Sequence, residues 1–183
     1  NLKKKILIAG QEGMVGSAVY NLLKRNKSYQ IVNCPRNKLD LTNLRNVEKW
    51  FKKNKPHIVI NCAGRVGGIL DNSNYQDEYL YINTIIGLNL INVSLRYNVK
   101  KLINLGSACI YPKKTKQPIK EEFLLSSYLE PTNEGYAIAK ISILKYCEYL
   151  KKKYKKDFIS LQPANLYGER DNFDLKSSHV IPA

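Results

Sequence analysis

The feature that most constrains this chain is a regular alternation of short apolar runs with longer segments of helical period. Five runs rich in Ile, Leu and Val are expected strands: residues 5–9, 29–33, 57–61, 101–106 and 158–162. Between them, four segments repeat apolar residues every three or four positions and are expected helices: 14–24, 43–53, 74–97 and 136–153. This alternation is typical of a parallel sheet covered by helices on both faces, so the sequence predicts a doubly wound α/β fold.

Composition supports one folded domain and bears on the cellular compartment in which we expect it. The 183 residues are 44% hydrophobic, which is enough for a core. No apolar run reaches the ~18 residues of a membrane span and no cleavable leader pattern begins the chain, so we expect a cytoplasmic protein without membrane contact. The four cysteines are widely spaced and form no C-x-x-C pair, so we expect free thiols and no metal site.

The net charge of +15 raises the question of a nucleic-acid partner. The lysines, however, are scattered over several expected helices and loops. Tyr75, Tyr79 and Tyr81 fall within an expected helix instead of alternating with lysine on a strand platform. We therefore expect no nucleic acid, and we attribute part of the positive charge to the attraction of small ligands that carry phosphate.

Three glycines, Gly10, Gly13 and Gly16, form a G-x-x-G-x-x-G pattern between the first expected strand and the first expected helix. Glycine permits a tight turn, close approach of backbone N–H groups to a pyrophosphate, and close packing of helix on strand. The helix N-terminus then faces negative charge. This placement predicts a Rossmann-type dinucleotide site, while a tight turn without a ligand is the alternative reading.

The end of the second expected strand bears on the choice between NAD and NADP. No acidic residue stands there to accept from a ribose 2′-hydroxyl, and Arg36 offers a guanidinium suited to a 2′-phosphate. NADP(H) is therefore favoured, although Arg36 could also be an ordinary solvated charge. Asp40 fits either a contact to adenine or an N-cap of the following helix.

Two reactive side chains, Tyr136 and Lys140, stand four positions apart at the start of an expected helix and so share one face. A phenol with a pKa near ~10 is a poor acid–base catalyst at neutral pH, and a neighbouring ammonium favours its phenolate form. Ser107 follows the fourth strand at its carboxyl end, the edge where open α/β sheets bind ligands. Cys109, two residues further on, would point the same way in extended backbone.

Together with the glycines, Ser107, Tyr136 and Lys140 resemble the extended short-chain dehydrogenase/reductase family. In that family the tyrosine protonates a ketone oxygen as NADPH delivers hydride, the serine holds that oxygen, and the lysine binds the nicotinamide ribose and lowers the tyrosine pKa. Further motifs resemble the GDP-L-fucose synthase branch: Gly13-Met14-Val15-Gly16-Ser17-Ala18, Val66-Gly67-Gly68-Ile69, Cys109-Ile110-Tyr111-Pro112, Glu130-Pro131-Thr132-Asn133-Glu134, Asn165-Leu166-Tyr167-Gly168, Asp171-Asn172-Phe173 and Ser178-His179-Val180-Ile181-Pro182-Ala183.

In that branch a cysteine and a histidine act as base and acid, and the resemblance places these roles at Cys109 and His179. Hydrogens on C3 and C5 of a 4-keto sugar are acidified by the carbonyl, so such a pair can invert those carbons through an enolate. Ser107 and Tyr136 would stabilise its oxygen. The implied substrate is a GDP-linked 4-keto-6-deoxy sugar. A buried structural thiol and a loop histidine are the alternative readings.

The resemblance also implies further contacts and a domain organisation. For the cofactor it implies roles for Met14, Val15, Ala63, Pro163 and Asn165. For the substrate it implies roles for Val66, Gly67 and Asn165. Residues 1–164 would form the NADP-binding domain and 165–183 the start of a substrate-binding region that is mostly absent. The two longest helices would pair in a homodimer.

Five positions depart from the branch. Glu12 replaces a basic residue in the glycine loop, Gly135 replaces a proline, and Ala108 replaces a second serine. Glu169-Arg170 stands where a proline and a histidine are usual, in the loop that faces the substrate. This difference keeps open a related GDP-6-deoxy-4-keto-heptose epimerase or C4 reductase. A non-catalytic scaffold is disfavoured, because it would not need all five reactive side chains.

Overall fold

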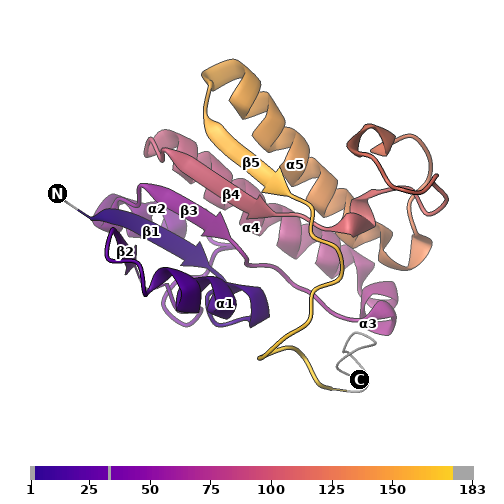
Figure 1. Ribbon diagram of the computed structural model, residues 1–183, viewed down its shortest axis with the longest axis horizontal. Coiled ribbons are helices and arrows are strands. Elements are labelled where there is room, and N and C mark those ends of the chain that lie inside the picture. The colour runs from indigo at the N-terminus through magenta and orange to yellow at the C-terminus, as the bar shows by residue number, and fades with distance from the viewer. Residues whose placement is uncertain (1–2, 33, 175–183) are drawn as a thin grey trace.

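The computed structural model describes residues 3–32 and 34–174, and the predicted fold class is confirmed. Five parallel strands form one sheet in the order β2-β1-β3-β4-β5 (Figure 1). Their bounds are β1 (Lys4–Ala9), β2 (Tyr29–Val32), β3 (Ile58–Asn61), β4 (Lys101–Leu105) and β5 (Asp157–Leu161). Each bound lies within one residue of its prediction, because buried strands read as short apolar runs between polar loops.

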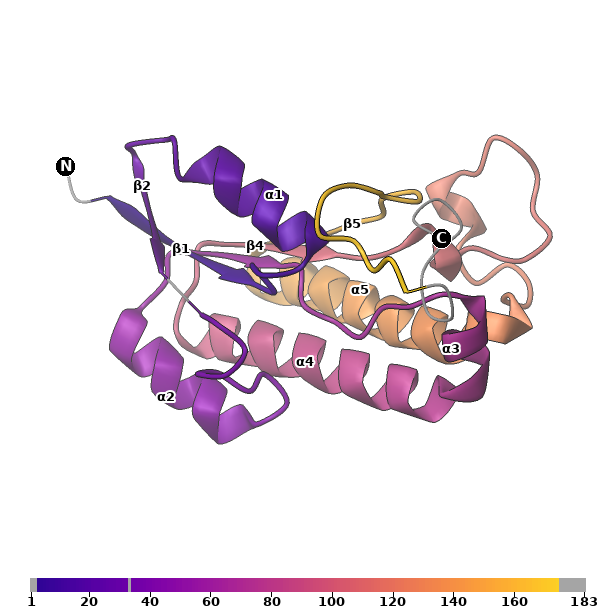
Figure 2. The same cartoon turned by 90° about the horizontal axis from the view of Figure 1, so that it is seen from below.

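Helices cover both faces of the sheet (Figure 2). One face carries α1 (Met14–Leu23), and the other carries α2 (Leu44–Asn54), α4 (Gln76–Arg96) and α5 (Glu134–Tyr154). Strand register explains the split, since alternate residues point to opposite faces. A row of four paired residues faces α2, α4 and α5 and is almost fully buried: Leu7, Val59, Leu102 and Phe158.

The helix predicted over 74–97 is confirmed as α4, but a further short helix that was not predicted precedes it. The structure has a short helix α3 (Ile69–Asn74) and then α4, and the backbone leaves helical geometry at Tyr75 with φ −129° and ψ 38°. The hydroxyl of Tyr79 on α4 donates a hydrogen bond to the Asp71 carboxylate on α3. That contact links the two helices across the break at Tyr75, and apolar periodicity does not encode it.

Irregular segments join the later elements. They include the 3₁₀ turns η1 (Ala108–Ile110), η2 (Glu121–Phe123) and η3 (Pro131–Asn133), and η3 leads directly into α5. Within the part of the chain that the structure describes, no helix is long and apolar enough to cross a membrane.

The carboxyl ends of all five strands meet at one edge, and the strand order reverses between β1 and β3. Gly10 follows β1 in the left-handed region, with φ +75°. A Cβ on Gly10 would lie 2.8 Å from the Cα of Ala63, just beyond β3, and a Cβ on Gly16 would lie 2.6 Å from the carbonyl carbon of Gly10. The glycine loop is therefore pressed against the end of β3 and against its own helix.

Substitution of Gly16 by serine should destabilise the fold, because the new Cβ must displace backbone and not a flexible side chain. We expect Gly16→Ser to lower the free energy of unfolding by about 1–3 kcal/mol, measured by urea denaturation followed by circular dichroism. Gly13→Ser is the matched control, since its Cβ would meet only the Gly10 carbonyl oxygen at an ordinary 3.5 Å. Equal losses in the two variants would contradict this account of the loop.

Candidate active site

Four of the side chains predicted to react gather at the carboxyl end of β4. Ser107 follows β4 and caps η1, its Oγ accepting a hydrogen bond from the backbone N–H of Cys109 at 3.2 Å. Tyr136, in the first turn of α5, hydrogen-bonds to the Ser107 hydroxyl. Lys140 lies one turn further along α5 and places its Nζ 5.4 Å from the centre of the Tyr136 ring. Residues 33 positions apart in the chain therefore share one site.

Cys109 reaches the site in a different way from the one predicted. An extended backbone was expected to point Ser107 and Cys109 in the same direction, but the chain turns into η1 immediately after Ser107. The turn forms because the serine hydroxyl satisfies an N–H that would otherwise lack an acceptor. Cys109 reaches the site through this turn, and its side chain is partly buried.

Burial dominates the electrostatics of the Tyr136–Lys140 pair. Lys140 is 6% exposed, and its Nζ donates to the carbonyl oxygen of Leu105 at 2.9 Å. Burial lowers the pKa of Lys140 to about 8, against the opposing influence of the Cys62 and Cys109 thiols. Burial also raises the pKa of Tyr136 to about 12; the charge of Cys109 adds to this rise and the hydrogen bond with Ser107 opposes it.

The role of Lys140 in lowering the pKa of Tyr136 stays a prediction, and the net shift of that pKa in this structure is upward because of burial. The Lys140 amine is engaged by the Leu105 carbonyl, and desolvation outweighs any attraction it exerts on the phenolate. At neutral pH Tyr136 is a phenol, which suits it to donating a proton.

A continuous row of side-chain amides and hydroxyls fixes the edge on which Ser107 sits. Strand register aligns Asn61, Asn104 and Ser160 on β3, β4 and β5. Asn61 donates to Asn104 at 2.8 Å, and Asn104 donates to the Ser160 hydroxyl at 3.0 Å. Beyond β5, Gln162 donates to the same hydroxyl at 3.1 Å.

At both ends of this polar row, a side-chain oxygen accepts a hydrogen bond from a backbone N–H group. At one end the Asn61 side-chain oxygen accepts from the N–H of Ala63 at 3.1 Å, and at the other the Gln162 side-chain oxygen accepts from the N–H of Ser107 at 2.9 Å. Sequence reasoning missed this row. The sequence did contain a signal for it, because Asn61 and Asn104 stand near the ends of two strands that are rich in apolar residues. A buried amide needs hydrogen-bond partners, so such asparagines indicate a polar network.

Tyr79 is a second residue that sequence reasoning missed. Its fully buried ring lies edge-on to the ring of Tyr136, with 6.2 Å between centroids. Because the Tyr79 hydroxyl is held by Asp71, the ring forms a fixed wall beside the Tyr136 phenol.

The glycine loop has the features that a phosphate group requires. Gly13 is the N-cap of α1 and supplies no side chain to its first N–H groups, and the first turn of α1 carries no acidic residue. These N–H groups and the helix dipole can therefore hold a pyrophosphate. The loop fits the dinucleotide that the glycine pattern predicts.

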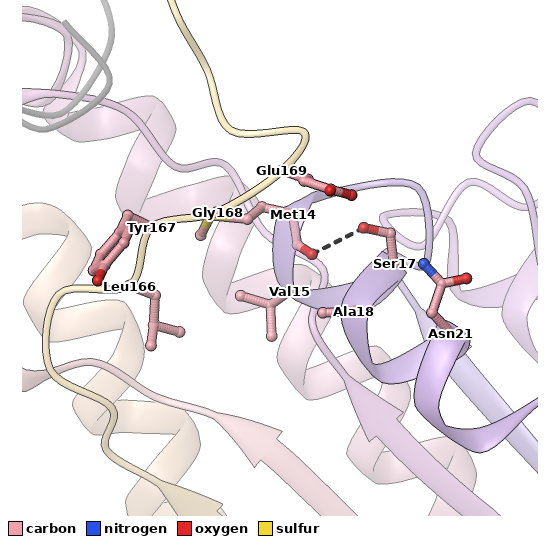
Figure 3. A pocket seen from close by; sticks show the side chains of 9 residues that line it. All are labelled: Met14, Val15, Ser17, Ala18, Asn21, Leu166, Tyr167, Gly168 and Glu169. Atoms are coloured by element: carbon pink, nitrogen blue, oxygen red, sulfur yellow. Dashed lines mark hydrogen bonds between the residues drawn. The ribbon is translucent and has the colours of Figure 1, made fainter.

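Met14 and Val15 line a hollow of about 340 Å³ on α1 (Figure 3). Leu166 and Gly168 border it from the segment that follows β5. Neither Ser107 nor Tyr136 lines this hollow.

Three residues near the end of β2 were predicted to influence the choice of cofactor. The side chains of Arg36 and Glu12 are exposed, and the Glu12 carboxylate accepts from the backbone N–H of Arg36 at 3.4 Å. The Asp40 carboxylate accepts from the hydroxyl and the N–H of Thr42, which lowers the pKa of Asp40. The N-cap alternative for Asp40 is wrong, because Asn43 caps α2.

The remaining predicted contacts are spread around the same edge. The Pro163 carbonyl accepts from the N–H of Ala108 at 3.1 Å, which ties the η1 turn after β4 to the segment after β5. Gly67 is buried, whereas Val66 and Asn165 are exposed. His179 lies outside the described residues, so its position remains a prediction.

All four cysteines are free thiols, as predicted. Cys34 and Cys147 are buried in the core, and burial raises the pKa of each to about 12. Cys62 is partly buried at the end of β3, and burial raises its pKa to about 11. These three thiols therefore remain protonated at neutral pH.

A parallel sheet with a glycine-rich first turn, and with serine, tyrosine and lysine gathered at its carboxyl edge, defines a dinucleotide-binding domain of the reductase and epimerase class. The model of the NAD dependent epimerase/dehydratase family matches residues 6–183, and the chain belongs to this family.

Individual relatives cover almost all of this chain. It is 52% identical over 180 residues to a GDP-L-fucose synthase of Sinorhizobium fredii, covering 98% of this chain and 57% of the relative. It is 44% identical over 181 residues to the GDP-L-fucose synthase of Escherichia coli, covering 99% and 56%. A structure of a GDP-mannoheptose C4 reductase from Campylobacter jejuni with NADP bound superposes with a TM-score of 0.92 at 37% identity, covering 100% and 54%. The chain thus spans little more than half the length of these relatives.

The lowered pKa of Lys140 predicts a specific pH dependence of stability. Between about pH 8 and the unfolded value near 10.5, the unfolded chain holds a proton on Lys140 that the folded chain does not. Stability from this group therefore rises with pH across that window, by up to about 3 kcal/mol. In urea denaturation from pH 7 to 10, the wild type should gain stability relative to Lys140→Met.

Lys151→Met, on the exposed end of the same helix, is the control and should follow the wild-type profile. Parallel profiles for wild type and Lys140→Met would refute the burial argument.

Proposed function

We propose that this chain is the cofactor-binding and catalytic portion of a GDP-L-fucose synthase. The reaction would be the NADPH-dependent epimerisation at C3 and C5, followed by reduction at C4, of GDP-4-keto-6-deoxy-D-mannose. The observation that carries the proposal is the meeting of Ser107, Cys109, Tyr136 and Lys140 at one strand end. The names of the two relatives described above support it.

For the cofactor we propose NADP(H), which supplies a hydride to the ketone carbon when bound. The N–H groups from Gly10 to Gly16, with Met14 and Val15, would hold the pyrophosphate. Arg36 would contact the 2′-phosphate and Asp40 the adenine. Around the nicotinamide end we place Lys140, Ala63, Pro163 and Asn165.

Glu12 opposes a strict preference for NADPH, because its carboxylate stands close to Arg36 and would repel a 2′-phosphate. The C. jejuni reductase structure, which contains NADP, supports NADP for this chain as well. Because the side chains of Glu12 and Arg36 are both exposed, solvent screening weakens the repulsion of the 2′-phosphate by Glu12 and its attraction by Arg36.

In the reduction, we assign Tyr136 the role of proton donor to the sugar O4. A phenol whose pKa is raised by burial carries its proton at neutral pH and can deliver it as the carbonyl carbon accepts hydride. The Ser107 hydroxyl, hydrogen-bonded to Tyr136, would donate to the same oxygen. Gln162 and the η1 turn hold the Ser107 backbone in place for this contact.

In the epimerisations, we assign Cys109 and His179 to opposite faces of the sugar ring. One removes the proton at C3 or C5, which leaves an enolate with its charge on O4, and the other returns a proton to the opposite face. Ser107 and Tyr136 would stabilise the enolate oxygen with the hydrogen bonds that later serve the reduction. Val66, Gly67 and Asn165 would frame the sugar.

A related enzyme acting on a heptose is the second candidate. The C. jejuni C4 reductase supports it through its 37% identity and TM-score of 0.92. The Glu169-Arg170 pair in the segment after β5 also supports it, because this pair departs from the fucose branch in a loop expected to face the sugar. Relative kcat/KM for GDP-4-keto-6-deoxymannose and the corresponding heptose would decide between them.

We also propose a homodimer, a cytoplasmic location and a boundary near residue 164 between the cofactor-binding and substrate-binding regions. The dimer is supported by α4 and α5, which pack side by side in the outer layer (Figure 2). They expose large apolar side chains, among them Leu80, Tyr81 and Ile138.

The decisive experiment uses the full-length protein with GDP-4-keto-6-deoxymannose and NADPH in heavy water. We expect deuterium at C3 and C5 of the product, by NMR, together with NADPH oxidation. Cys109→Ser should lower deuterium incorporation by about 100-fold or more, whereas hydride transfer to an already epimerised ketone should persist. Tyr136→Phe should instead lower hydride transfer by a similar factor.

Two results would change the assignment. NADPH oxidation without deuterium at either carbon would leave a plain C4 reductase. Full exchange in Cys109→Ser would remove this thiol from the mechanism.

A further inference from the structure

Helix α5, which carries Tyr136 and Lys140, begins in an unusual way. Its N-cap residue is Asn133, one of the residue types that normally accepts a hydrogen bond from an N–H in the first turn. Asn133 makes no such cap, although Asn43 does so at the start of α2, where its side chain accepts from Asn46. The same residue type therefore behaves differently at the two helix starts.

The missing cap is supplied from a different helix. Gln76, the first residue of α4, accepts from the Gly135 N–H through its side-chain oxygen at 3.0 Å. Its side-chain nitrogen donates to the Pro131 carbonyl at 2.9 Å, so the amide bridges both sides of the helix start. Gly135 permits this approach, since a Cβ there would lie 3.1 Å from the Gln76 carbonyl carbon.

With its capping role taken by Gln76, the Asn133 side chain turns toward Cys109. The Asn133 Nδ2 donates to the Cys109 Sγ at 3.5 Å. The Asn133 Oδ1 is buried and has no hydrogen-bond partner among the described residues. An unpaired buried acceptor lowers stability, so this orientation is unfavourable for the fold at a point next to a proposed catalytic thiol.

We propose that Asn133 is a positioning residue for Cys109, and that Gln76 frees it for this task. The inference rests on the proposed function, because it assigns Asn133 to the epimerisation steps and not to the reduction. An amide N–H donated to sulfur fixes the direction of the thiol and stabilises negative charge on it during proton exchange. Tyr136 and Ser107, which handle O4, make no contact with this amide in the hydrogen bonds described above.

The first test is Asn133→Asp in the full-length protein. Aspartate keeps the shape and caps a helix as well as asparagine does, but an ionised carboxylate cannot donate to sulfur. We expect deuterium incorporation at C3 and C5 to fall by about tenfold or more. Hydride transfer to an epimerised ketone and the urea midpoint of unfolding should stay close to wild type.

Asn43→Asp is the matched control, because it makes the same change at an ordinary N-cap outside the site. It should alter neither exchange nor reduction. Unchanged exchange in Asn133→Asp, or an equal loss of exchange and reduction, would overturn the proposal.

The second test examines Gln76. Gln76→Ala leaves the Gly135 N–H without its acceptor, so the Asn133 oxygen should turn to cap the helix and its nitrogen should leave the thiol. Exchange should then fall selectively, as in Asn133→Asp. In the double variant the losses should not add, since both changes break one contact. Additive losses would separate Gln76 from Asn133 and refute the assigned coupling.

A third measurement separates this inference from the proposed function. The rate of alkylation of Cys109 by iodoacetamide, followed by peptide mass spectrometry, needs no sugar substrate and depends on the reactive thiolate. It should fall in Asn133→Asp and remain at the wild-type value in Asn43→Asp. If the wild type shows no exchange but alkylation responds in this way, the proposed epimerase fails and the contact stands. Equal alkylation rates in wild type and Asn133→Asp overturn the contact itself.

Discussion

The row of hydrogen-bonded side chains from Asn61 to Gln162 is the constraint on which the site depends. It crosses β3, β4 and β5 one layer beyond the apolar row, and it ends on the backbone N–H groups of Ala63 and Ser107. The first of these adjoins the glycine loop and the second carries the serine hydroxyl. A parallel sheet brings strand ends to one edge, but this row determines how far apart the two functional segments stand.

Burial sets the protonation of Tyr136 and Lys140, whereas hydrogen bonding links the reactive groups to one another. Tyr136 and Lys140 are removed from water, so each favours its neutral form, while Ser107 connects the phenol to the turn that carries Cys109. Around them, Tyr79 packs edge-on against Tyr136. Gln76 caps the start of α5, and Asn133 contacts Cys109 instead of capping its own helix. Local rules of capping and helix continuity are broken close to the chemistry and are kept elsewhere, as at Asn43.

Sequence reasoning predicted the strands, the covering helices, the glycine turn and the meeting of Ser107 with Tyr136, because each follows from periodicity or from the geometry of parallel strands. It could not predict the break at Tyr75, the turn after Ser107 or the cap from Gln76. Those features depend on contacts between residues distant in the chain. It also omitted burial, because a spacing of four shows that Tyr136 and Lys140 are close but not the desolvation that both groups undergo.

The two helical layers lie on opposite faces of the sheet, each with its own apolar cluster. The glycine loop belongs to the α1 side of the sheet, whereas Tyr136 and Lys140 belong to the layer of α4 and α5 (Figure 2). A dinucleotide that touches both would cross-link the layers and bind only the folded chain. By mass action, each such ligand raises the melting temperature according to its concentration and affinity. Thermal denaturation would therefore rank NADPH against NADH before any sugar is available.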